Sequence, residues 1–109
     1  MQVSETQWST QEKEIAKAAL KTAHNREIQS LINVIRERAS GVATIDDVWH
    51  LNDFLSARRF DIDGKYDDRE SESLFVLAKL TKDGWLAIED LLGLEPTKLS
   101  KITALTRVL

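Results

Sequence analysis

The acidic residues around Gly64 have the spacing of a calcium-binding loop. If Gly64 takes position six of an EF-hand loop, acidic residues fall at positions three, five, nine and twelve: Asp61, Asp63, Asp67 and Glu70. Position one, which requires a carboxylate, is occupied by Arg59. A guanidinium at that position would repel Ca²⁺, so the sequence predicts a solvated acidic turn instead of a metal site.

A second pattern, LLGLEPTKLSKI at 91–102, is similar to the helix-hairpin-helix turn that binds nucleic-acid phosphates. That motif needs two glycines, and here Glu95 replaces the second one, which brings negative charge to the phosphate position. The net charge of the chain is -3, whereas affinity for nucleic acids depends largely on Lys and Arg. Nucleic acid is therefore not expected as a partner.

No residue pattern in the sequence indicates catalysis. The chain has no cysteine, its two histidines stand far apart at 24 and 50, and it lacks a G-x-S-x-G motif and a glycine-rich phosphate loop. Adjacent aspartates such as Asp46 and Asp47 point in different directions on a helix. We therefore expect a non-enzymatic protein with no cofactor and no small-molecule substrate, whose partner is another protein.

The composition indicates a single all-α domain over residues 1–109. Apolar residues make up 42% and charged residues 30%, with one proline and four glycines in 109 residues. No apolar stretch is long enough to cross a bilayer or to serve as a signal peptide, so a cytoplasmic location is expected.

The first helix is predicted to be unusually long. Residues 9–12, STQE, form a capping box in which Ser9 accepts a backbone N–H and Glu12 reaches back to the cap. No proline or glycine follows before Gly41, so the helix can run from about Thr10 to Ala39, a length of about 45 Å. A compact globule of this size is only about 34 Å across, so the helix should extend beyond its own domain.

The apolar residues of this helix change face half-way along. At about 100° per residue, one group lies on one side and a second group on nearly the opposite side; these are Ile15, Ala19 and Ala23, and then Ile28, Leu31, Ile32, Ile35 and Ala39. Either the helix breaks near His24 and Asn25, or it is continuous and its halves contact different neighbours, one of them a second chain. We favour dimerisation.

Shorter helices follow. TIDD at 44–47 predicts the start of a second helix that ends near Phe60, before the turn dipeptide Asp63-Gly64. A third helix is predicted from about Asp67 to Lys82, with Gly84 as its C-terminal cap. Two more short helices should cover WLAIEDLL at 85–92 and the segment after Pro96. Residues of about 8–62 would then form a dimerisation part and about 65–109 a compact helical head.

The second helix carries polar residues on its apolar face. Asn52 and Arg59 lie on the same arc as Val48 and Leu55, with Trp49 at its edge. A seven-residue step such as Asn52 to Arg59 keeps two side chains on one seam of a helix pair, where polar groups can fix register. One interpretation makes Trp49 core filler and lets Arg59 extend along the edge of its own core.

We favour the alternative, an interface that only a second chain completes, because Trp and Arg are enriched at binding hot spots. In a two-fold dimer, Arg59 of one protomer could pair with Asp53 of the other.

Residues 45–69, IDDVWHLNDFLSARRFDIDGKYDDR, closely resemble the fluorescence recovery protein family of cyanobacteria, and the resemblance extends over essentially the whole chain. It implies an all-helical homodimeric regulator of photoprotection without a cofactor. Such a regulator binds the photoactivated red form of the orange carotenoid protein, mainly through the C-terminal domain of that partner. It speeds the return to the orange form and the release from the phycobilisome on the cytoplasmic side of the thylakoid membrane, which ends non-photochemical quenching.

The resemblance also implies roles for particular residues. Trp49, Asp53 and Arg59 match the family's patch at the dimer interface and partner site. Phe75 and Lys101 match positions in the helical head that are linked to partner contact.

Two features qualify this assignment of roles. Asn52 stands where the family is expected to have histidine, so a pH-sensitive role at that position is in doubt. Lys101 shares its helix with Lys98 and Arg107, which leaves a solvated basic face as the alternative to a partner contact. The remaining functional alternatives are a helical dimeric adaptor for another protein and a helix-hairpin-helix nucleic-acid binder.

Overall fold

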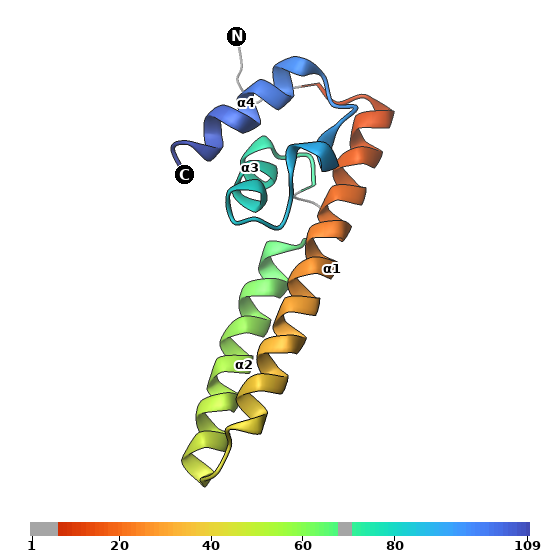
Figure 1. Ribbon diagram of the computed structural model, residues 1–109. Helices are drawn as coiled ribbons and strands as arrows, with labels where there is room; N and C mark the ends of the chain where they lie inside the picture. Colours follow the sequence, from red (N-terminus) through yellow and green to blue (C-terminus); the bar gives the residue numbers. More distant parts are fainter. Residues whose placement is uncertain (1–6, 68–70) are drawn as a thin grey trace.

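The computed structural model describes residues 7–67 and 71–109, and every regular element in these ranges is a helix, as predicted. The molecule is elongated, with extents of 58 × 25 × 25 Å and a radius of gyration of 17.0 Å (Figure 1). A compact chain of this length would have a radius of gyration of only about 13 Å. The elements in chain order are α1 (Thr10–Ser40), α2 (Ile45–Lys65), α3 (Leu74–Lys82), the 3-10 helix η3 (Ile88–Leu91) and α4 (Pro96–Thr106).

The helices form two parts. We call α2 and the C-terminal half of α1 the stalk, and we call α3, η3, α4 and the N-terminal half of α1 the head (Figure 1). None of the helices in the described ranges combines the length and the apolar character needed to cross a membrane.

The first helix is continuous over 31 residues, so of the two explanations the break near His24 and Asn25 is wrong and the unbroken helix is confirmed. Ser9 accepts the Glu12 N–H at 3.1 Å and the Glu12 carboxylate accepts the Ser9 N–H at 3.0 Å, which confirms the capping box. The change of apolar face has a structural cause. The first half buries small residues such as Ala19 and Ala23 against the head. In the second half, which runs beside α2, Ile28, Leu31 and Ile35 are half-buried, whereas Ile32 and Ala39 are exposed.

The second helix begins as predicted, with Thr44 and Asp47 forming a capping box, but its predicted end is wrong. It continues past Phe60 and through the Asp63-Gly64 dipeptide to Lys65. The reason is tertiary: Ile62 is buried in this last stretch, and Lys65 forms an ion pair with a buried carboxylate of α1. These contacts outweigh the local turn preference of Asp-Gly.

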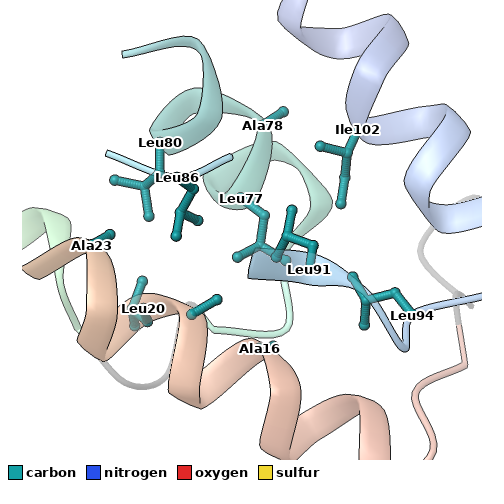
Figure 2. Packing of buried hydrophobic residues seen from close by; sticks show 11 residues of the cluster. Ala16, Leu20, Ala23, Leu77, Ala78, Leu80, Leu86, Leu91, Leu94 and Ile102 are labelled. Carbon is teal, nitrogen blue, oxygen red and sulfur yellow. The ribbon is translucent and has the colours of Figure 1, made fainter. Parts of the chain in front are cut away.

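The core of the head is a cluster of leucine, isoleucine and alanine side chains (Figure 2). Ala16, Leu20 and Ala23 of α1 face Leu77 and Leu80 of α3, and Leu91 fills the space between them. Ile102 of α4 closes the cluster from the other side. Alanine on α1 allows the elements of the head to approach this long helix closely, and the leucines supply most of the buried area.

The third helix is shorter than predicted. It begins at Leu74, where the Ser73 hydroxyl accepts the Val76 N–H, while Asp67 precedes it and residues 68–70 lie outside the described ranges. Its C-terminus confirms the glycine cap. Gly84 has a φ of 89°, and the N–H groups of Gly84 and Trp85 donate to the carbonyl oxygens of Thr81 and Leu80, the hydrogen-bond pattern of a Schellman motif.

Candidate partner-binding surface

The predicted seam of α2 lies open on the surface of the chain. We define the α2 seam as Ile45, Val48, Trp49, Asn52, Asp53 and Arg59. Trp49 is 56% exposed and Ile45 61% exposed, whereas Leu51 and Leu55, at the side nearer α1, are half-buried. The interpretation in which Trp49 fills the core of its own chain is therefore wrong.

Arg59 also lies outside the core of its own chain. Its side chain is 85% exposed and reaches Asp63, one turn further along, at 3.7 Å. A surface ion pair of this kind contributes little to stability and exchanges readily. The interpretation in which Arg59 extends along its own core is wrong, and the single chain does not pair Arg59 with Asp53.

The arginine that supports the fold is the preceding residue, Arg58. Its guanidinium contacts Glu27 of α1 at 2.7 Å, and the ammonium of Lys65 contacts the same carboxylate at 3.0 Å. The Tyr66 hydroxyl donates to it at 2.6 Å. We call Glu27, Arg58, Lys65 and Tyr66 the Glu27 cluster. The sequence interpretation missed it, although the i, i+7 spacing of Arg58 and Lys65 could have indicated two cations on one helix face.

The electrostatics of this cluster follow from its burial. The Glu27 side chain is 1% exposed, and burial alone would raise its pKa. The hydrogen bonds from Tyr66, Lys65 and Arg58 outweigh that effect and hold the Glu27 pKa below its usual value. Burial, followed by the hydrogen bond to the Glu27 carboxylate, raises the pKa of Tyr66. The cluster therefore fixes the end of α2 on α1 with a charged carboxylate and a neutral phenol.

The two predicted head residues lie on its surface. Phe75 on α3 is 55% exposed, and Lys101 on α4 is exposed. Lys98, one turn before Lys101, does not belong to a solvated basic face. It is 5% exposed, and its ammonium contacts the buried carboxylate of Glu12 at 3.0 Å. Lys101 is thus a more isolated surface cation than the sequence suggested.

Trp49 and the two head residues lie at different ends of the molecule. Trp49 follows the start of α2 by one turn, at the end of the stalk remote from the head, whereas Phe75 and Lys101 belong to the head (Figure 1). Arg59 lies ten residues after Trp49, about 15 Å along the helix axis. The α2 seam therefore extends from the remote end of the stalk toward the head, and its Trp49 end is separate from the two head residues.

The structure explains the two motif-like patterns, the calcium-loop spacing around Gly64 and the segment 91–102 that is similar to a helix-hairpin-helix. Asp61 and Asp63 belong to the last turns of α2 and contact Arg58 and Arg59. The predicted turn is therefore wrong at these two residues, which are helical, but their side chains are exposed to solvent as predicted. Glu70 lies outside the described ranges. Within residues 7–67 and 71–109, no group of three or more His, Cys, Asp or Glu side chains could hold a metal ion.

In the segment similar to a helix-hairpin-helix, a carboxylate of the same chain binds the backbone at the expected phosphate position. The backbone N–H of Glu95 donates to the Glu12 carboxylate at 3.0 Å, so the chain's own acid takes the place of a phosphate. This bond, the Ser9 N–H and the Lys98 ammonium outweigh burial and lower the pKa of Glu12 to about 2.

Comparisons with known proteins agree with this architecture. The sequence model of a family described as "Photoprotection regulator fluorescence recovery protein" matches residues 8–106. A fluorescence recovery protein from Synechocystis sp. is 45% identical over 108 residues, 99% of each chain. The solved structure of the Fremyella diplosiphon fluorescence recovery protein is similar with a TM-score of 0.84 and 46% identity, over 93% of this chain and 99% of that chain. The solved structure of the Synechocystis protein gives the same values.

Proposed function

The chain belongs to the fluorescence recovery protein family of photoprotection regulators, and we propose that it binds the activated red form of the orange carotenoid protein. In this proposal it contacts mainly the C-terminal domain of that partner and accelerates its return to the orange form. Release from the phycobilisome, on the cytoplasmic side of the thylakoid membrane, follows and ends non-photochemical quenching. The protein carries out no bond chemistry of its own.

The observation that carries the proposal is the exposed α2 seam. An isolated chain that leaves Trp49 56% exposed and Val48 40% exposed beside a loosely paired arginine has a surface suited to another polypeptide. We propose that a second copy covers part of this seam in a homodimer. Arg59 of one protomer then pairs with Asp53 of the other, and the Asn52 amide fixes the register of the helices.

The proposed mechanism is differential binding. To accelerate a conformational return, the dimer must bind the barrier state of its partner more tightly than the open form, by about 1.4 kcal/mol for each tenfold in rate. It must also bind the closed product weakly, so that it is released. In this mechanism Trp49 and Phe75 supply apolar contacts, and Asp53, Arg59 and Lys101 orient the partner's domains.

The direct test measures red-to-orange relaxation of the carotenoid protein with and without this protein. Trp49→Ala and Arg59→Ala should slow recovery, whereas His50→Ala, an exposed residue of α2 outside the seam, should not. The oligomeric state of each variant is followed by light scattering. Wild-type recovery rates for both seam variants at saturating protein would exclude Trp49 and Arg59 from the mechanism.

Two rival functions are distinguished by binding. An adaptor for another protein would not co-elute with the light-activated carotenoid protein, whereas the proposed regulator should co-elute with the activated form and not with the dark form. A nucleic-acid binder would shift DNA in a salt-dependent manner. Occupation of the Glu95 N–H by Glu12 disfavours this last alternative.

A further inference from the structure

Gly64 occupies the penultimate position of α2 without a steric reason for glycine. Its backbone is helical, and it is not among the glycines with positive φ, which are Gly84 and Gly93. A Cβ added at Gly64 would meet no atom within 4 Å. Because glycine destabilises a helix relative to alanine, the fold of the single chain gives no advantage to glycine at this position.

The missing side chain opens a pocket between the end of α2 and α3. We call it the Gly64 slot; it has a volume of about 220 Å³ and is lined by Gly64, Lys65, Phe75, Val76, Lys79 and Leu80. The lining is almost entirely apolar. The Lys65 ammonium is held by Glu27 at 3.0 Å, so this residue contributes mainly its methylene stem to the slot. The slot thus suits one apolar side chain.

Aromatic side chains and one cation surround this slot. Phe75 in its wall is 55% exposed, and Phe60, one helical turn before Gly64, is 85% exposed. The Lys79 ammonium contacts Asp83 at 3.4 Å, and its side chain is 52% exposed. Since a surface ion pair within one helix is weak, this ammonium can exchange Asp83 for a carboxylate supplied by another molecule. The surroundings therefore fit an apolar side chain with an acidic neighbour.

The slot is separated from the apolar residues of the α2 seam along the helix axis. Gly64 follows Trp49 by fifteen residues, about 22 Å along the axis. Around the helix it is turned about 140° from Arg59 but only about 20° from Asp53.

We propose that the Gly64 slot receives an apolar side chain of the activated carotenoid protein and that a neighbouring carboxylate of the same partner binds Lys79. This inference rests on the proposed function. Gly64 leaves the room that this side chain needs.

The test compares two glycine-to-leucine substitutions. Gly64→Leu fills the slot without removing any side chain. Gly41→Leu is the matched control at the remote end of the stalk, where φ is -93° and an added Cβ lies 3.6 Å from the Arg38 carbonyl oxygen, an ordinary contact. The dissociation constant for the light-activated carotenoid protein and the recovery rate below saturation are measured, with melting temperature and oligomeric state as checks.

Gly64→Leu should weaken binding at least about tenfold, Gly64→Ala by a smaller factor, and Gly41→Leu should bind as wild type. The Gly64 variants should melt at or above the wild-type temperature. A folded Gly64→Leu protein with wild-type affinity would overturn the slot proposal alone. A wild-type protein that does not bind the activated partner would overturn the proposed function itself.

A second pair of variants tests the role of the Lys79 charge. It also tests partner binding at the Gly64 slot if Gly64→Leu does not fold. Lys79→Glu should weaken binding at least about threefold, whereas Lys82→Glu, an exposed residue of the same helix outside the slot, should not. Equal affinities of these two variants would refute the predicted pairing of Lys79 with an acidic residue of the partner.

Discussion

Replacing Glu27 with leucine is predicted to destabilise the protein by about 3 kcal/mol. The substitution removes a carboxylate that is 1% exposed and leaves the cations of Arg58 and Lys65 and the hydroxyl of Tyr66 without their acceptor. Breaking a buried ion pair typically costs about 3–5 kcal/mol. The lower end applies here, because the side chains of Arg58 and Lys65 are 29% and 22% exposed and can reach water.

The assay is urea denaturation at a fixed protein concentration, since the stability of the proposed homodimer would depend on concentration. Glu14→Leu is the matched control, because Glu14 lies on the same helix and is exposed; its free energy of unfolding should change by no more than about 0.5 kcal/mol. If Glu27→Leu cost less than about 1 kcal/mol, the Glu27 cluster could not be what fixes α2 on α1.

A double-mutant cycle isolates one bond of this cluster. Tyr66→Phe alone should cost about 1.5–3 kcal/mol, as expected for a hydrogen bond to a charged group. In the Glu27→Leu background, Tyr66→Phe should lower the free energy of unfolding by less than it does in the wild type, with a coupling free energy of about 0.5–3 kcal/mol. Fully additive effects would show that the Tyr66 hydroxyl and the Glu27 carboxylate do not interact in solution.

Three further predictions concern the head and the acid response. Lys98→Met should destabilise the fold by about 3 kcal/mol, because the Glu12 carboxylate stays buried without its cation, and thermal melting at neutral pH measures this loss. The folded-state pKa values of Glu12 (about 2) and Glu27 lie below the ordinary 4.5, so the unfolded chain binds more protons. Stability should therefore be complete above about pH 4.5 and fall as the pH decreases toward 2, and Glu12→Gln should flatten this fall in urea titrations across that range. Gly93→Ala should lower the free energy of unfolding by about 1–3 kcal/mol, because φ is 109° and the new Cβ would clash with Cδ1 of Ile15; an unchanged melting temperature would contradict that close approach.

The sequence alone predicted the features that depend on neighbouring residues. Ser9 with Glu12 and Thr44 with Asp47 act three residues apart, so their capping boxes could be recognised from the letters. The absence of glycine and proline before Gly41 gave the length of α1, and the resemblance of residues 45–69 indicated the family. The sequence also indicated that the α2 seam is unusual, since the spacing places the polar residues Asn52 and Arg59 on the apolar arc of the helix.

The end of α2, the choice between Arg58 and Arg59, and the burial of Lys98 were decided only by the tertiary structure. Glu27 meets Lys65 across 38 residues, and Glu12 meets Lys98 across 86. Such pairs depend on which helix faces pack together, and spacing along one helix does not contain that information. Two adjacent arginines look alike in the sequence, but they point about 100° apart on the helix. Only the position of α1 determines that Arg58 reaches a buried carboxylate while Arg59 remains in solvent.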